Sequence, residues 1–264
     1  MPSTTFCKSL CAAAIGVMSL TLSAQAAEVR AVAKYAVTLG GTQIATANVS
    51  LDDTGSTYSM AVDAKISGLA QLVANGTARL ESTGNSTGSG LRAQKFDIVT
   101  HASGEDFSVA ITYASGGVAS FVVTPPIVNN IDRVAIERKQ LTAANDMAAS
   151  FVLKGGKLDK SLCDRKLQIF TGVERFNLSM RYTKDDVATS KRTGYQGPLV
   201  LCSVKYTPIS GHYTTSEVTT YLAASERILI WYAPLAAPGY FIPYRAIIST
   251  EAGDLSVVLT DLQQ

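Results

Sequence analysis

The sequence predicts an all-β protein built on one large, curved antiparallel sheet, open or spiral and barrel-like, with one to three short helices. Apolar and polar residues alternate along many segments, which is typical of strands with one buried face and one wetter face. Glycine pairs such as Gly40-Gly41 and Gly116-Gly117 separate neighbouring strand-like segments, as hairpin turns do. Helical periodicity is scarce by comparison.

The first half of the chain has the pattern of successive strands. From Val29 to Leu39 every second residue is apolar, and Gly40-Gly41 then turns the chain into the segment from Thr42 to Leu51. Gly68 to Ala74 is compatible with a short turn of helix. The stretch 84–90 lacks the lysine and following helix of a phosphate loop and indicates a flexible hairpin tip. Four further strands are expected at 58–66, 95–100, 107–113 and 118–124.

Patterning is weakest between Pro125-Pro126, which end a strand, and Asn145. This connector either divides two domains or forms a flap over one continuous sheet. The first half carries few bulky core residues of its own, which favours the flap. We therefore expect residues 27–264 to form a single β-rich domain.

The second half continues in the same style after one expected helix. Asn145 can cap a helix from Asp146 to Leu153, which Gly155-Gly156 would stop. Thr215 to Ser225 is either another short helix or a loop. Strands are expected at 166–170, 173–182, 199–206, 227–233, 240–250 and 254–262.

Residues 1–26 have the pattern of a signal peptide. Lys8 gives a short positive region, a mostly apolar run extends from Leu10 to Leu22, and small residues at Ala24 and Ala26 predict cleavage before Ala27. The apolar run is too short for a permanent membrane anchor. Removal of 26 of the 264 residues leaves 238, and we expect this mature chain to be periplasmic.

Export determines which cysteines remain. Cys7 and Cys11 leave with the signal peptide, whereas Cys163 and Cys202 stay in an oxidising compartment, where two thiols usually pair. The disulfide would close a loop of roughly forty residues and contribute about 3–4 kcal/mol. Two unrelated buried thiols are the alternative. A metal site would need more ligands than His101 and His212 can add.

Charge and hydropathy exclude several classes of partner. The formal net charge of +2 falls to about +1 once Lys8 is removed, so neither nucleic acid nor an anionic membrane surface is expected to bind. No cofactor motif is present, and we expect no cofactor. The longest later apolar stretch, Ile228 to Tyr244, is interrupted by three prolines and indicates two strands and a turn rather than a transmembrane segment.

Residues suited to catalysis are isolated, so we expect no enzyme activity. His101 and His212 have no nucleophile or metal-ligand spacing around them. Neighbouring residues on a strand point to opposite faces, so the pairs Asp52-Asp53 and Asp185-Asp186 are expected to be solvated turn acids rather than convergent dyads. Three arginines on predicted strands are expected at the surface, with a buried anchor for a carboxylate or phosphate as the alternative: Arg175, Arg181 and Arg245.

The best candidate for a binding surface is an aromatic hairpin around Pro234 and Pro238. Its first strand is apolar on both faces, and few helices are available to cover a second face. Aromatic rings with a polar edge suit a lipid, a glycan or a protein partner. Ordinary core packing is the competing interpretation. The candidate binding residues are Trp231, Tyr232, Tyr240 and Tyr244.

Three segments resemble an uncharacterised family of exported Gram-negative envelope proteins, catalogued as domain of unknown function 3108. They are Tyr35-Ala-Val-Thr-Leu-Gly-Gly-Thr-Gln-Ile44; Asp146-Met-Ala-Ala-Ser150 with Cys163 and 169–178; and 202–211 with Pro243-Tyr-Arg245. The resemblance implies a periplasmic protein with a curved antiparallel sheet, of a kind found in lipoprotein-carrier and envelope-integrity proteins, and implies no reaction. Thr171 departs from the aspartate expected in the family's turn.

Three functions follow in order of preference. The first is a non-catalytic periplasmic protein that binds another envelope component, protein or glycan, and supports envelope integrity. The second is a carrier of a lipid-like ligand in the concave face of the sheet. The third is a hydrolase of unknown type. A continuous apolar cavity would favour the carrier, and a closed core with an exposed aromatic patch would favour the binder. Convergent histidines or carboxylates would favour the enzyme.

Overall fold

The computed structural model describes residues 28–72 and 75–264. The predicted signal peptide, with Cys7 and Cys11, lies outside the described residues. The described chain is all-β, as predicted, with one α-helix and four short 3-10 turns. Among the helices of this described part, none is long and apolar enough to cross a membrane.

The elements follow the predicted alternation closely. The strands are β1 (Val29–Leu39), β2 (Thr42–Asp53), β3 (Thr57–Ile66), β4 (Gly76–Thr87), β5 (Gly90–Ala102), β6 (Glu105–Ala114), β7 (Gly117–Thr124), β8 (Leu153–Lys154), β9 (Arg165–Phe170), β10 (Arg175–Ala188), β11 (Gly197–Ser210), β12 (Ile228–Pro234), β13 (Tyr240–Thr250) and β14 (Gly253–Gln263). The helical elements are α1 (Glu217–Ala224), η1 (Gly68–Leu72), η2 (Arg138–Leu141), η3 (Ala149–Phe151) and η4 (Lys160–Cys163).

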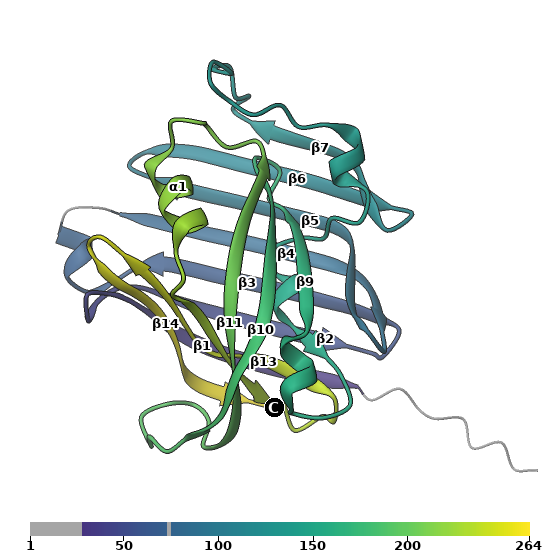
Figure 1. The fold of residues 1–264 in the computed structure, drawn as a ribbon, viewed down its shortest axis with the longest axis vertical. Helices are drawn as coiled ribbons and strands as arrows, with labels where there is room; N and C mark the ends of the chain where they lie inside the picture. The colour runs from purple at the N-terminus through teal and green to yellow at the C-terminus, as the bar shows by residue number, and fades with distance from the viewer. Residues whose placement is uncertain (1–27, 73–74) are drawn as a thin grey trace, which may run out of the picture.

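All fourteen strands belong to one sheet, and the chain starts in its middle. The order is β7-β6-β5-β4-β3-β2-β1-β14-β13-β12-β11-β10-β9, with β8 paired to β13, and every pairing between strands is antiparallel. We call β1–β7 the N-terminal wing and β9–β14 the C-terminal wing. Figure 1 shows β9, β10 and β11 crossing steeply in front of the strands of the N-terminal wing. The sheet is curved but not closed, because β7 and β9 end it without pairing.

The connector between β7 and β9 (residues 125–164) does not lie over the sheet as a flap. Its later part, residues 141–163, is here named the interior segment. Leu141, Ala148 and Val152 belong to the main apolar core, to which both wings contribute, whereas Leu153 and Leu162 belong to a second core with the C-terminal wing. The interior segment therefore packs between the two wings and fills the concave side of the sheet.

Asn145 fixes the interior segment to both wings. Its side chain accepts from Ala93 N and donates to Leu91 O, both at 3.0 Å, beside an irregularity in the β4–β5 pairing. Its main chain donates to Gln168 O at 2.8 Å and accepts from Phe170 N at 3.0 Å on β9. One residue thus satisfies backbone groups that a bulge and a sheet edge leave unpaired.

The predicted helix from Asp146 to Leu153 is wrong. Because the Asn145 side chain is engaged with β5, it caps nothing; the Asp146 carboxylate instead accepts from Ala148 N and Ala149 N, and only the three-residue turn η3 follows. Leu153 then pairs with β13 as part of β8. By contrast, α1 falls within the segment proposed as helix or loop, and η1 lies where the first short helical turn was expected.

Strand β4 escaped prediction because its buried positions are small or polar. Ser82 and Ser86 face inward and are almost fully buried. Hydrophobic alternation therefore fails there, although the period of two is intact. The expected flexible tip at 84–90 is correspondingly too long, since β4 continues to Thr87 and β5 begins at Gly90.

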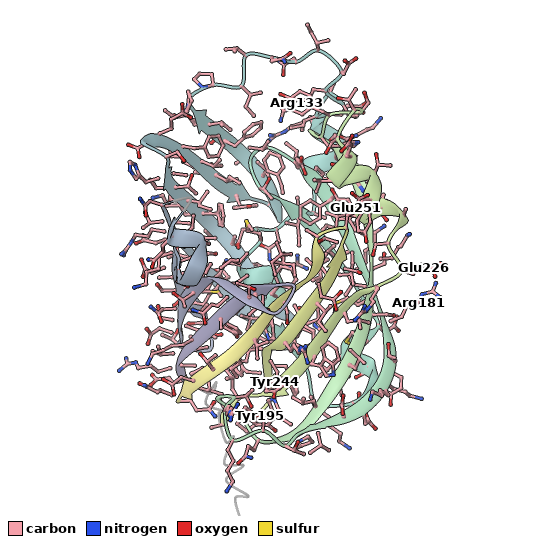
Figure 2. All side chains as sticks on the ribbon, turned by 90° about the vertical axis from the view of Figure 1, so that its left-hand side faces the viewer. Arg133, Arg181, Tyr195, Glu226, Tyr244 and Glu251 are labelled. Atoms are coloured by element: carbon pink, nitrogen blue, oxygen red, sulfur yellow. A yellow bond between two sulfur atoms is a disulfide. The ribbon has the colours of Figure 1, made fainter. Side chains whose placement is uncertain are left out.

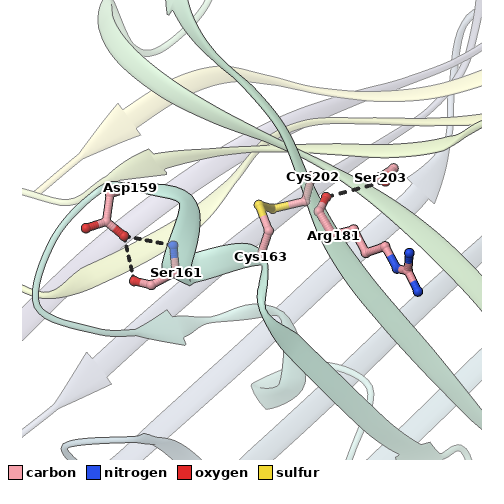
Figure 3. The surroundings of a disulfide bond; sticks show 6 residues. All are labelled: Asp159, Ser161, Cys163, Arg181, Cys202 and Ser203. Carbon is pink, nitrogen blue, oxygen red and sulfur yellow. Dashed lines mark hydrogen bonds between the residues drawn. A yellow bond between two sulfur atoms is a disulfide. The ribbon is translucent and has the colours of Figure 1, made fainter.

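The structure contains the predicted disulfide between Cys163 and Cys202. The two Cα atoms are 5.4 Å apart, and the bond joins the end of η4 to β11 (Figure 3). Asp159 begins η4 by accepting from Ser161 N at 2.8 Å and from Ser161 Oγ at 2.6 Å. The disulfide therefore ties the interior segment to the C-terminal wing.

We predict that Cys202→Ser lowers the free energy of unfolding by about 3–4 kcal/mol, because it releases a closed loop of 39 residues in the unfolded chain. Urea unfolding of the oxidised protein measures the change. Wild type treated with reductant is the control and should lose a similar amount. An unchanged midpoint in both would contradict a stabilising disulfide.

Candidate functional site

The aromatic hairpin does not gather its four candidate residues on one surface. Tyr232 is completely buried in the second core with Leu162 of the interior segment, and Tyr240 is buried in the main core. Tyr244 is also buried, where its hydroxyl donates to Thr193 Oγ1 at 3.0 Å. The second apolar face of β12 is thus covered by the interior segment, a coil that sequence patterning did not place there.

Trp231 alone among the four keeps a partly exposed side chain. Its indole N–H donates to Asp186 Oδ2 at 2.9 Å, and the Arg245 guanidinium lies 5.6 Å from the ring centroid. The hydrogen bond from Trp231 is the main cause that lowers the pKa of Asp186. Figure 2 shows Tyr244 beside Tyr195 near one end of the molecule and Arg133 near the other. A binding role for the hairpin stays a prediction.

Asp53 is the clearest departure from the expected solvated acids. Asp52 is exposed and pairs with Arg30, but Asp53 is buried inside the sheet. Its Oδ2 accepts from Ser86 Oγ at 2.5 Å and from Tyr240 OH at 2.9 Å. It points inward because it shares the buried face of β2 with Leu51.

Lys154 completes this buried polar cluster. Its Nζ donates to Ser86 Oγ at 2.7 Å and to Tyr240 OH at 2.8 Å, and lies 3.6 Å from Asp53 Oδ2. Ser86 Oγ donates to Asp53 Oδ2, so the serine proton faces the carboxylate and not the amine. The cluster joins β2, β4, β8 and β13, and its arrangement is that of a structural ion pair.

The other candidate residues take separate positions. His101 on β5 is exposed beside Asp106, with 2.6 Å between Nδ1 and Oδ1, whereas His212 follows β11. Arg181 and Arg245 are exposed, as expected. Arg175 is instead buried and donates to Gln140 O at 2.9 Å and Gln168 Oε1 at 2.7 Å. Arg175 anchors the connector, because the Gln140 carbonyl oxygen and the Gln168 amide oxygen take the place of the water that would otherwise solvate its guanidinium.

An apolar cavity of about 470 Å³ opens where the two wings fail to close. We call it the edge cavity. Phe121 and Val123 of β7 line one side and Ile127 and Ile136 of the connector another. The Phe121 ring meets Phe170 of β9 edge to face, with centroids 5.0 Å apart, so an aromatic contact bridges the open seam.

The β9–β10 turn forms the floor of the edge cavity. Gly172 has φ +86°, and a Cβ there would come within 2.1 Å of Val109 Cγ1, so only glycine lets the turn approach β6. The Thr171 hydroxyl accepts from Glu174 N at 3.0 Å. It supplies the local side-chain acceptor that an aspartate would supply in such a turn.

Arg133 stands at the rim of the edge cavity. Its Nε donates to Gly211 O at 2.7 Å and its Nη2 to Val173 O at 2.6 Å. These partners are carbonyls, and within the described residues no carboxylate neutralises its charge. The sequence pattern did not indicate this site, because the connector has no strand or helix periodicity. Apolar residues within a connector without regular structure were the available indication of a cavity there.

Comparisons with known proteins identify relatives without an assigned activity. The family model described as "Protein of unknown function (DUF3108)" matches residues 34–260. A solved structure titled as a β-barrel-like protein of domain of unknown function DUF1849 from Brucella abortus is similar, with 12% identity and a TM-score of 0.47. That match covers 89% of this chain and 97% of the other. No curated protein matches the sequence.

Asp146 provides a test of the buried contacts around the interior segment. Burial raises its pKa, although Ala149 N, Ser82 Oγ and Ala148 N donate to its carboxylate. The unfolded state therefore ionises at lower pH than the folded state, and the stability that Asp146 contributes is lost as pH rises through its folded pKa. We predict that Asp146→Asn gains stability relative to wild type as pH rises above the ordinary aspartate pKa of about 4.

Urea unfolding of both proteins at several pH values measures this trend. Asp159→Asn is the matched control, because hydrogen bonds from Ser161 lower the pKa of Asp159. The stability that Asp159 contributes is lost as pH falls, so Asp159→Asn should lose stability relative to wild type as pH rises, opposite to Asp146→Asn. Parallel stability curves for wild type and Asp146→Asn would contradict the assignment.

Proposed function

Because the chain belongs to the DUF3108 family of proteins of unknown function, its family assigns it no role. We propose that it is an exported, non-catalytic envelope protein that binds a partner protein along the free edge of β7. The observation that carries the proposal is an uncharged, unpaired strand edge that borders an apolar cavity.

The edge of β7 lacks the features that usually prevent strand addition. Its sequence, Gly-Val-Ala-Ser-Phe-Val-Val-Thr, contains no charged residue and no proline. Within the described residues, it receives one hydrogen bond from outside the sheet, from Arg138 Nη1 to Ala119 O at 3.2 Å. The beginning of β7 packs against the connector, since a Cβ on Gly117 would lie 2.7 Å from Leu141 O. The exposed part of the strand, from Ala119 to Val122, is where we propose that another extended chain pairs.

Apolar side chains around this edge are unusually exposed. Val122 on β7 is 62% exposed, and Val128 and Ile131 on the adjoining connector are 88% and 77% exposed. Val122 projects from the face of β7 opposite to Phe121 and Val123, which line the edge cavity, so exposed apolar residues lie on both sides of this strand edge. Single exposed apolar residues need no explanation, but a group along one edge is typical of a binding site. Burial against a partner would remove this surface from water.

The occupant that fits is an extended protein segment with alternating apolar side chains and one acidic residue. Its backbone would pair with β7, and its apolar side chains would enter the edge cavity beside Phe121. The acidic residue would face Arg133, whose charge has no internal carboxylate partner. Peptide pairing supplies affinity in such complexes, and the pockets supply specificity.

The alternatives receive less support. A carrier would need a continuous apolar cavity along the concave side of the sheet; the interior segment packs there, and the apolar edge cavity lies between β7, the connector and the β9–β10 turn. A hydrolase would need convergent acid–base groups, and His101 and His212 lie on separate elements. Export is supported by the signal-peptide pattern of residues 1–26 and by a disulfide, a bond typical of oxidising compartments.

We predict that the periplasmic fraction of a Gram-negative host contains a chain beginning at Ala27. The intact mass of the unreduced protein should match residues 27–264 with both cysteines oxidised, since Cys163 and Cys202 form the disulfide. Full-length chain confined to the cytoplasmic fraction, or a periplasmic chain with two free thiols, would argue against export and oxidation.

We predict that Val122→Lys combined with Val128→Lys weakens partner capture at least tenfold. Lysine on the strand edge and on the adjoining connector opposes docking of an apolar segment, while exposed positions tolerate the change with little loss of stability. The measurement is photo-crosslinking in cells from a reactive residue at Ser120, followed by quantification of the crosslinked partner by mass spectrometry.

Val99→Lys is the matched control. Val99 is also an exposed valine, at 52%, but it lies on β5, a strand paired on both sides. It should leave the crosslinked partner unchanged. Equal capture by wild type and the double variant, or equal loss in the Val99→Lys control, would reject β7 as the docking edge.

A further inference from the structure

The C-terminal wing has a strongly basic face that points away from the N-terminal wing. On its inward face, Met180, Cys202 and Ile230 belong to the second core. The opposite face points outward, as Arg181 does in Figure 2, and its residues on β9–β13 are here named the outer face. Five exposed cations lie on it: Lys166, Arg181, Lys184, Lys205 and Arg245.

The pairing register of the strands brings these cations to one side of the sheet. Directly opposite residues on neighbouring strands project from the same face. One such row crosses β10 to β13: Lys184, Leu201, Trp231 and Arg245. Two shorter rows lie beside it: Arg181 with Ser203, and Lys166 with Ser179 and Lys205. The three rows follow one another at steps of two residues along β11, so all five cations project outward.

Trp231 is fixed among these cations by polar contacts. Its indole N–H donates to Asp186 Oδ2 at 2.9 Å, and Lys184 Nζ lies 3.4 Å from the same oxygen. The Arg245 guanidinium lies 5.6 Å from the ring centroid. The half-buried ring is therefore held in one orientation between two positive charges. An aromatic group that is ordered in advance loses little entropy when a ligand contacts it.

The positive charge of the outer face is not neutralised from within. Among the described strands β9–β13, Asp186 is the one carboxylate on this face, because Asp185 pairs with Val200 of the second core and projects from the other side. Glu226, on the loop before β12, lies at the margin of the face (Figure 2). In the described part of the chain, four of the five cations form no salt bridge: Lys166, Arg181, Lys205 and Arg245.

We propose that the outer face binds an anionic glycan. The guanidinium groups of Arg181 and Arg245 suit the acidic groups of such a glycan, because their paired N–H donors match a carboxylate or a phosphate. The Trp231 ring suits the apolar side of a sugar ring, which packs against aromatic groups. The formal net charge of the whole chain is only +2, so this concentration of positive charge is local and attracts a partner to one face.

An anionic membrane fits the outer face less well. Peripheral binding to a bilayer depends on apolar side chains that enter the lipid as well as on charge. The aliphatic residues Leu201 and Ile247 on this face are only 4% and 6% exposed, and the Trp231 N–H is already bonded to Asp186. The proposed glycan site is independent of the proposed function, since β7 contributes nothing to it.

The test uses the single tryptophan of the chain as its own reporter. Purified mature protein is titrated with an oligogalacturonate, an oligosaccharide that carries one carboxylate on each sugar, and with neutral maltohexaose. We expect a saturable change of Trp231 fluorescence with oligogalacturonate, weakened by salt, and no change with maltohexaose. Polyglutamate and phosphatidylglycerol vesicles represent an acidic protein and an anionic membrane. Equal affinity for either of these would overturn the glycan assignment.

The first variant removes two exposed cations, Arg181→Gln with Arg245→Gln, and the control removes two exposed cations of the N-terminal wing, Lys65→Gln with Arg92→Gln. Calorimetry measures the affinity for oligogalacturonate without depending on fluorescence. We expect at least a tenfold weaker affinity in the first variant and less than a twofold change in the control. Equal weakening in both would show general electrostatic attraction and overturn the site, as would no binding by wild type.

Asp186→Asn gives a test of opposite sign. Asparagine still offers an oxygen to the Trp231 N–H but removes the one carboxylate of the outer face. We expect this variant to bind oligogalacturonate at least twofold more tightly than wild type, a gain that a purely structural role of Asp186 would not produce. Unchanged or weaker binding by Asp186→Asn would contradict the placement of the glycan beside Trp231.

Discussion

The architecture depends on how the interior segment satisfies its own polar groups and those of the strands it touches. Asn145 makes two side-chain hydrogen bonds to β5 and two main-chain hydrogen bonds to β9. The carboxylate of Asp146 accepts a hydrogen bond from the Ser82 hydroxyl of β4. A buried backbone group left without a partner costs about 1–3 kcal/mol. These two adjacent residues therefore link the two wings at the seam where β7 and β9 do not pair.

Closure by a coil instead of a strand pair has consequences at the open seam. It leaves β7 with one free edge and places two cavities beside the connector, one apolar near Phe121 and one near Arg165. A fully paired barrel would have consumed the same backbone groups. The features that support binding thus arise from the same departure from regular sheet pairing.

Sequence alone predicted most strands because their inward positions are apolar and their outward positions polar. It missed β4, whose buried Ser82 and Ser86 contact Asp146 and Lys154, and it misplaced Asp53 for the same reason. Polar residues inside the sheet are stable only with partners that are distant in sequence. The helix expected after Asn145 failed likewise, since tertiary hydrogen bonds took the groups that local capping would use.

The pairing of β1 with β14 has a consequence for the order of folding. Val32 lies opposite Gln263, so one edge of β1 can pair with β14 only after almost the whole chain has been synthesised. In a chain delivered N-terminus first, the hairpins from β1 to β7 can form locally while the other side of β1 stays an unpaired strand edge. Such long-range closure is slow, and the nascent protein would present two open edges, β1 and β7, of which the finished molecule keeps only one.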